Sequence, residues 1–148
     1  LKAQERMDTI LSANYADKRV DAVLCNNDAL ALGVLASLEN AGYGTEELPY
    51  PVITGMDCDI ANIKAIIAGK ISMTVFKDNR IIAAKAAEVM DCMIKGETPE
   101  AGDAYETTFN NGVKDVTAFL IAPKVIDVNN YQEVLFDSGY YTEDMLDE

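Results

Sequence analysis

The sequence predicts an α/β fold built on a doubly wound parallel sheet, because short apolar runs alternate with helical patterns along the chain. Three runs rich in Val, Ile and other apolar residues lie at residues 20–25, 52–56 and 71–76, and a helical pattern follows each of them. Parallel strands joined by helices need right-handed crossovers, and such sheets are covered on both faces. We therefore expect one α/β layer with helices on each side.

Acidic residues and glycines set the boundaries of the predicted helices. A first helix is expected over residues 2–14, ahead of the first strand. The helices that follow the strands are expected to begin at the capping residues Asp28, Asp59 and Asp78 and to end at Gly42, Gly69 and Gly96, respectively.

Beyond residue 96 the pattern is weaker. A polar linker at residues 97–102 precedes a strand at 104–109, and the sequence Asn-Asn-Gly at 110–112 predicts a tight turn. Two further extended segments, a short helix and a frayed acidic end follow, at residues 119–123, 124–128, 129–136 and 143–148.

Composition argues against several classes of function. Twenty-five acidic residues against twelve basic ones give a net charge of −13, so no nucleic acid is expected as a partner. The chain has no histidine, which removes Ser-His and Cys-His nucleophilic sites. Its three cysteines, Cys25, Cys58 and Cys92, lack the spacing of a metal or redox site. Composition therefore weighs against hydrolase chemistry, and we expect no metal and no cofactor.

Polar residues follow each of the three predicted strands, where ligands bind in open parallel sheets. Once the expected capping residues are set aside, the first loop leaves Asn27, the second Asp57 and the third Lys77. A polyol ligand needs an amide that donates and accepts, a carboxylate that accepts from two hydroxyls and an ammonium that donates. Asn27, Asp57 and Lys77 are therefore the candidate ligand-binding residues.

Other interpretations of these loops stay open at this point. Asn, Asp and Lys at strand ends are common solvated loop residues. Asp57 with Asp59 is a conceivable carboxylate pair for catalysis, although a loop acid and a helix cap explain the same spacing. Phosphate binding is disfavoured, because the glycine-rich phosphate motifs are absent from the sequence and its negative charge opposes an anion.

Residues 20–28 (VDAVLCNND), 52–57 (VITGMD) and 73–78 (MTVFKD) look like a strand with an Asn-Asp step, a V-x-G-x-D strand and a T-V-[YF]-K-D segment. These three motifs, and also residues 110–116 and 134–141, resemble the periplasmic-type monosaccharide-binding proteins of ABC transporters, in their xylose-binding and multiple-sugar-binding branch. The resemblance covers nearly the whole chain. It implies one lobe of a two-lobed, type I periplasmic-binding-protein fold.

The resemblance also implies roles for residues and segments. In the family, the Asn, Asp and Lys of these three motifs hydrogen-bond the sugar, and they correspond to Asn27, Asp57 and Lys77. It further implies that roughly half of the protein lies upstream of this chain. Residues 1–77 would form the ligand-binding lobe, residues 78–104 a crossing and a helix that belong with the first lobe, and residues 105–148 the return strands and C-terminal tail.

The function that the resemblance implies is the non-catalytic capture of a monosaccharide such as xylose, glucose or galactose. The protein would be extracytoplasmic, in the periplasm or as a cell-surface lipoprotein, and would dock on an ABC transporter permease. The alternative is the effector-sensing lobe of a sugar-responsive transcription regulator, which shares the fold. A third reading is a doubly wound enzyme with Asp57 and Lys77 as acid and base. With one lobe, this chain alone is expected to bind sugar weakly and to dimerise or exchange segments.

Overall fold

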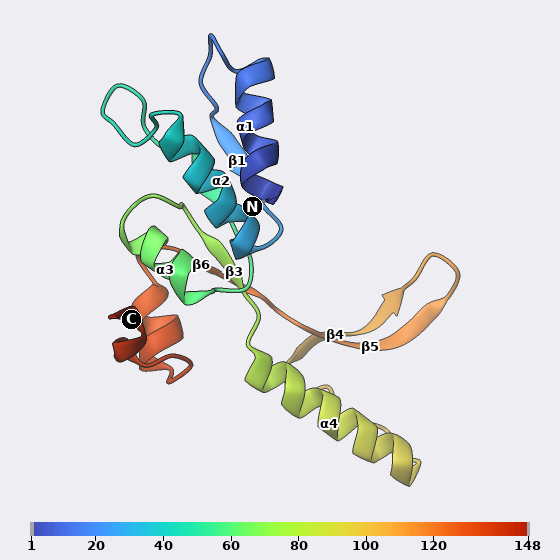
Figure 1. Ribbon diagram of the computed structural model, residues 1–148. Coiled ribbons are helices and arrows are strands. Elements are labelled where there is room, and N and C mark those ends of the chain that lie inside the picture. The colour runs from blue at the N-terminus through green and yellow to red at the C-terminus, as the bar shows by residue number, and fades with distance from the viewer. Residues whose placement is uncertain (1, 148) are drawn as a thin grey trace. The chain divides into compact units, whose positions relative to one another are not determined.

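The computed structural model describes residues 2–147, which form two compact units (Figure 1). The first unit holds the described residues up to Phe76 and those from Val125 onward, and the second unit is Lys77–Lys124. No helix among residues 2–147 combines the length and the apolar character needed to span a membrane.

The first unit contains the predicted alternation of helices and strands. Its helices are α1 (Lys2–Asn14), α2 (Asp28–Asn40) and α3 (Ile60–Ile67), and its strands are β1 (Ala22–Leu24), β2 (Val52–Thr54) and β3 (Thr74–Phe76). A further strand, β6 (Lys124–Ile126), begins at the last residue of the second unit. The described chain then ends in a π-helical segment, η1 (Gln132–Asp137), and a 3-10 helix, η2 (Glu143–Leu146).

The strands join edge to edge in chain order. Strand β1 pairs with β2 in parallel, with Val23 opposite Ile53. A parallel bridge between Thr54 and Met73 joins the end of β2 to the residue before β3, and β3 pairs with β6. The predicted parallel arrangement of the first three strands is therefore confirmed.

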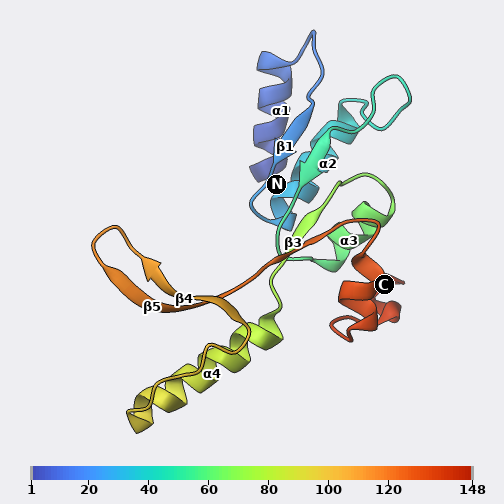
Figure 2. The ribbon, with the colours of Figure 1, turned by 180° about the vertical axis from the view of Figure 1, so that it is seen from behind.

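Helices α1, α2 and α3 lie on one face of these strands. They stand in front of the strands in Figure 1 and behind them in Figure 2, which views the chain from the opposite side. Right-handed crossovers explain this for α2 and α3, because strands placed in chain order put the helices that connect them on the same side. Helix α1 precedes β1 and packs against α2. On the other face, Leu24 and Val52 are 82% and 52% exposed, so the expected cover on both faces is not found at β1 and β2.

The core lies between the helices and the strands. Ile53, at the centre of β2, is fully buried under the helical layer, and Ile126 and Leu135 bring the C-terminal segment into the same core. The buried apolar side chains are Met7, Val20, Ala31, Val34, Leu35, Leu38, Tyr43, Ile53, Cys58, Ile63, Ala65, Ile66, Ile71, Phe76, Ile126, Leu135 and Phe136.

The second unit consists of the long helix α4 (Asn79–Lys95) and an antiparallel hairpin of β4 (Ala104–Asn110) and β5 (Asp115–Ile121). The predicted Asn-Asn-Gly turn joins the two strands, and Gly112 takes a φ of 87° that favours glycine. Lys85 of α4 contacts the rest of this unit, because its Nζ donates to the Glu100 carbonyl at 2.9 Å and lies 5.4 Å from the centre of the Phe119 ring.

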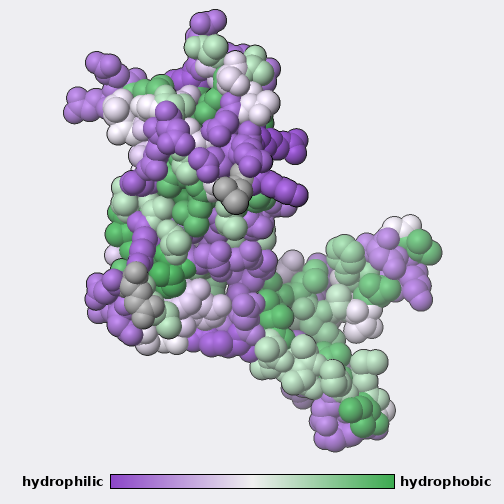
Figure 3. All heavy atoms as spheres, viewed as in Figure 1, coloured by the Kyte–Doolittle hydropathy of each residue, from purple (hydrophilic) through white to green (hydrophobic). Residues whose placement is uncertain are grey.

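Helix α4 keeps its apolar side chains on the surface. None of its residues is buried in the described part of the chain, and Met90, Met93 and Ile94 are 64%, 74% and 80% exposed. Figure 3 shows hydrophobic residues in green gathered over the elements of this unit. A helix with an apolar surface and no buried residue has spare area for a further partner.

The end of the chain is more ordered than predicted. Instead of a frayed tail, residues Glu143–Leu146 form η2, and Leu146 packs against the core. The Gln132 Nε2 of η1 donates to the Glu143 Oε1 at 3.1 Å. The packing of Leu146 thus favours an ordered segment despite the acidic composition. Glu148 of the predicted tail lies outside the described residues.

Candidate functional site

Asn27 follows β1 and begins α2. Its backbone is extended, and its Oδ1 accepts a hydrogen bond from the Leu30 N–H at 2.8 Å. Asn27 is therefore the N-cap of α2, and the prediction that Asp28 caps this helix is wrong. Asn and Asp are similarly good caps, so their adjacent positions could not decide between them. The cap uses the amide oxygen of Asn27, and its Nδ2 group can still donate to a ligand.

Asp57 lies in the loop between β2 and α3, in a backbone conformation that residues other than glycine rarely adopt. The φ angle is 106° at Asp57 and 61° at Cys58. Such conformations cost about 1–3 kcal/mol each and persist where the surrounding structure holds them. Asp59 occupies the N-cap position of α3 as predicted, but its side chain makes no capping hydrogen bond.

The loops that carry Asn27 and Asp57 are hydrogen bonded to each other. The Asp28 N–H donates to the Met56 carbonyl at 2.8 Å, and the Asp59 N–H donates to the Asp28 Oδ2 at 2.8 Å. The structure thus brings Asn27 and Asp57 into neighbouring loops at the carboxyl ends of two adjacent parallel strands. Ligands bind at this edge in open parallel sheets.

Asp28 is fully buried between these loops. Its Oδ1 accepts from the Thr74 Oγ1 of β3 at 2.7 Å. Burial raises the pKa of the Asp28 carboxyl, while the hydrogen bonds from Thr74 and from the Asp59 N–H act in the lowering direction. Burial also raises the pKa of the neighbouring Cys58 thiol to about 12, so this thiol is neutral at physiological pH and is not an activated nucleophile.

The C-terminal segment contacts the loop of Asp57. The Tyr141 hydroxyl donates to the Cys58 carbonyl at 3.0 Å, and burial raises the pKa of Tyr141 to about 12, which keeps this donor protonated. The ring of Tyr140 packs edge-on against Phe76, the last residue of β3, with ring centres 4.7 Å apart. Residues far along the chain therefore stabilise the end of the sheet that carries the candidate site.

Lys77 directly follows β3 and is the first residue of the second unit. The structure therefore brings together two of the three predicted ligand-binding residues, Asn27 and Asp57. The position of Lys77 is given by the chain, one residue beyond the end of β3.

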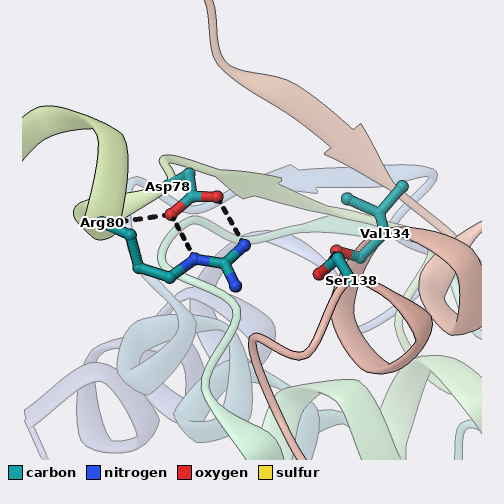
Figure 4. Close-up of polar contacts among 4 residues, drawn as sticks. All are labelled: Asp78, Arg80, Val134 and Ser138. Atoms are coloured by element: carbon teal, nitrogen blue, oxygen red, sulfur yellow. Dashed lines mark hydrogen bonds and ion pairs between the residues drawn. The ribbon is translucent and has the colours of Figure 1, made fainter.

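Asp78 caps α4 as predicted. Its Oδ1 accepts from the Arg80 N–H at 3.0 Å and its Oδ2 pairs with the Arg80 Nη2 at 2.7 Å (Figure 4). The hydrogen bond from Arg80 lowers the pKa of the Asp78 carboxyl. Figure 4 also labels Ser138 at the end of η1, whose hydroxyl donates to the Val134 carbonyl at 2.7 Å.

Sequence reasoning missed the buried residues that hold the loops, above all Asp28 and Thr74. One signal was present, because Asp28 lies three and seven residues before Ala31 and Leu35, which places all three on the buried face of α2. The partnership with Thr74 had no local signal, since 46 positions separate the two residues.

A protein-family model described as a periplasmic binding protein domain matches residues 1–98. The chain is 44% identical over 144 residues to the multiple sugar-binding periplasmic receptor ChvE of Rhizobium radiobacter, which covers 97% of this chain and 40% of the receptor. It is 36% identical over 140 residues to the D-xylose-binding periplasmic protein of Escherichia coli (strain K12), covering 95% of this chain and 39% of that protein. The chain thus spans about two fifths of the length of these relatives.

Solved structures similar to this chain are also solute-binding proteins. A solute-binding protein of an ABC transporter from Clostridium phytofermentans, with bound β-D-glucose, matches with a TM-score of 0.81 at 43% identity, over 97% of this chain and 43% of that one. A carbohydrate transporter solute-binding protein from Chloroflexus aurantiacus, in complex with D-glucose, matches with a TM-score of 0.80 at 30% identity, over 97% of this chain and 40% of that one. The α/β lobe, its paired loops and these similarities agree, and the chain belongs to the periplasmic binding protein family.

Proposed function

We propose that this chain is part of an extracytoplasmic solute-binding protein that captures a monosaccharide for an ABC transporter and catalyses no reaction. The relatives support this proposal, because ChvE and the xylose-binding protein are named for periplasmic sugar binding and both matched structures contain glucose. The neutral Cys58 thiol and the absence of histidine from the sequence are consistent with binding without catalysis.

The proposed sugar site consists of Asn27, Asp57 and Lys77. The Asp57 carboxylate accepts from two sugar hydroxyls, the Asn27 Nδ2 donates, and the Lys77 ammonium donates to a hydroxyl or ring oxygen. The observation that supports the proposal is the hydrogen-bonded pair of loops that carry Asn27 and Asp57, because both loops follow the carboxyl ends of adjacent parallel strands, where ligands bind in open parallel sheets. The chain position of Lys77, directly after the next parallel strand, is compatible with the same edge.

The segments of the chain are proposed to serve different lobes of the whole protein. Residues 1–77 belong to the ligand-binding lobe, residues 78–104 form a crossing and a helix that pack with a first lobe, and residues 105–148 are the return strands and the C-terminal tail. The exposed apolar residues of α4 support this division, because a helix of this kind needs a further surface to cover it. Closure of the two lobes on the sugar and docking on a permease complete the proposed role.

The proposal is tested with the full-length protein by measuring its melting temperature in the presence of a panel of monosaccharides. A ligand that binds the native state raises the melting temperature by mass action, so we expect at least one aldose to raise it in a concentration-dependent way. Nucleoside phosphates and amino acids serve as control ligands and are expected to leave it unchanged. A panel in which no sugar changes the melting temperature would contradict the proposed function.

A further inference from the structure

The loop that presents Asp57 is strained and yet is held at four successive residues. The carbonyl of Met56 accepts from the Asp28 N–H at 2.8 Å, and the Asp57 N–H donates to the Val75 carbonyl at 3.0 Å. The Cys58 carbonyl accepts from the Tyr141 hydroxyl, and the Asp59 N–H donates to the Asp28 Oδ2. Residue 28 therefore holds this loop at both ends, with its backbone before the two positive φ angles and with its side chain after them.

The Asp28 carboxylate bridges three elements. It begins α2, accepts from the N–H of Asp59 at the start of α3, and accepts from the Thr74 hydroxyl in β3. Both carboxylate oxygens are used, and the side chain is fully buried. Hydrogen bonds to a buried charged group contribute about 1.5–3 kcal/mol each, so this bridge can offset the strain of the loop.

The space for this bridge depends on Gly55, the first residue after β2. A Cβ atom added at Gly55 would clash with the Asp28 Oδ1, the oxygen that accepts from Thr74. Gly55 does not have a positive φ angle, so its role here is the room that it leaves for the carboxylate. The Gly of the motif VITGMD is thus explained by the neighbouring carboxylate.

We propose that Asp28 is a positioning residue for the sugar site: its buried carboxylate, held by Thr74, fixes the strained Asp57–Cys58 turn so that the Asp57 carboxylate is aimed before the ligand arrives. This proposal rests on the proposed function, and it adds Asp28 and Thr74 as residues on which the sugar affinity depends. Without the bridge, the turn relaxes toward ordinary φ values, and the free energy needed to restore it is lost from binding.

Two pairs of substitutions in the full-length protein test this role by titration calorimetry with the sugar found in the thermal panel. Asp28→Ala removes both bonds of the carboxylate and is expected to raise the dissociation constant at least about tenfold, whereas Asp28→Asn keeps an acceptor for the Asp59 N–H and has a smaller effect. Thr74→Val removes one hydroxyl at nearly constant volume and is expected to weaken binding about threefold to tenfold. Thr74→Ser restores that hydroxyl and is expected to restore the affinity.

Loss of general stability is separated from loss of positioning by Leu38→Ala. Leu38 is fully buried in the last turn of α2, about 15 Å along the helix from Asp28, and its truncation is expected to destabilise the fold without touching the loop. All dissociation constants are measured at a temperature where each variant is folded. Leu38→Ala is expected to bind sugar as the wild type does.

The outcomes distinguish this proposal from the proposed function. The positioning role is supported if Thr74→Val weakens binding, Thr74→Ser restores it and Leu38→Ala binds normally. These three results support it even if Asp28→Ala fails to fold. If Asp57→Ala abolishes binding while Asp28→Ala and Thr74→Val bind as the wild type does, positioning by Asp28 is overturned and the sugar site stands. If the wild type binds no sugar, the proposed function fails, and the positioning role fails with it.

Discussion

At the scale of single residues, the buried polar side chains of the first unit differ in how they are hydrogen bonded. Asp28 and Thr74 are fully buried and bonded to each other, and the buried Ser37 hydroxyl donates to Asp8. Asn62 of α3 is also fully buried, but within residues 2–147 neither its Nδ2 nor its Oδ1 has a hydrogen-bond partner. An unsatisfied buried amide of this kind costs stability.

Asn62→Leu should therefore stabilise the protein. Leucine has a similar shape and removes the cost of burying an unbonded amide, so we expect the free energy of unfolding to rise by about 1 kcal/mol or more. Denaturant titration measures this change. Ser37→Ala is the matched control, because it removes a bonded buried hydroxyl and is expected to lower the free energy of unfolding. A clear loss of stability in Asn62→Leu would contradict the prediction.

Residue-level prediction from sequence succeeded for the loops and failed for the buried bridge. Asn27 and Asp57 follow β1 and β2 in the sequence, and the carboxyl ends of adjacent parallel strands necessarily lie together. Asn27 caps α2 in place of Asp28, whose carboxylate accepts a hydrogen bond from the distant Thr74. The positive φ angles of Asp57 and Cys58 depend on hydrogen bonds from other elements. Contacts made across such separations leave no local pattern.

At the scale of elements, helix ends were well predicted where the cap is local. Asp78 binds the N–H and the guanidinium of Arg80, two residues away, and Gly96 ends α4 with a left-handed φ of 71°. The faces of the sheet were less predictable. The sequence indicates where strands lie but not which of their faces a helix covers. Leu24 and Val52 are exposed, although they belong to apolar runs for which cover on both faces was expected.

Asp78→Ala should destabilise the start of α4 by about 1 kcal/mol, since it removes both the cap and the ion pair. The Arg80 partner lowers the pKa of Asp78, so this contribution is fully present above the unfolded pKa of about 4. It is lost as the pH falls from there through the lower folded pKa. Chemical denaturation of the wild type and the variant is measured from about pH 2 to about pH 7. The difference between their free energies of unfolding should become smaller in acid.

The matched control for this helix is Asp91→Ala. Asp91 pairs with Lys95 on the exposed surface of α4 at 2.7 Å, and such pairs contribute about 0.5 kcal/mol or less. Equal losses of stability in Asp78→Ala and Asp91→Ala would show that the cap has no special role.

At the scale of the whole molecule, this chain spans about two fifths of the length of its relatives and exposes apolar side chains in both units. Met93 and Ile94 lie on α4, and Leu24 and Val52 lie on the open face of β1 and β2. Exposed apolar surface of this extent favours association. The family could be inferred from the ordered motifs, whereas the identity of the proposed sugar depends on contacts that a single lobe does not complete.

We predict that the 148-residue chain on its own self-associates, as dimers or by exchange of segments. Size-exclusion chromatography with light scattering over a dilution series is expected to give an apparent mass that rises with concentration. The double substitution Met93→Gln and Ile94→Gln should reduce association if α4 forms the contact, and Leu24→Thr should reduce it if the open face of β1 does. A constant monomer mass at every concentration would refute the prediction.

The most direct test of the proposed sugar site is titration calorimetry of the full-length protein with the sugar found in the thermal panel, comparing Asp57→Ala with Asp21→Ala. The two variants change the net charge equally, but Asp21 lies before the amino end of β1, is highly exposed and pairs with Arg19. We expect Asp57→Ala to weaken binding by at least about tenfold, the value of a lost charged hydrogen bond, and Asp21→Ala to bind as the wild type does. Undiminished binding by Asp57→Ala would contradict the account.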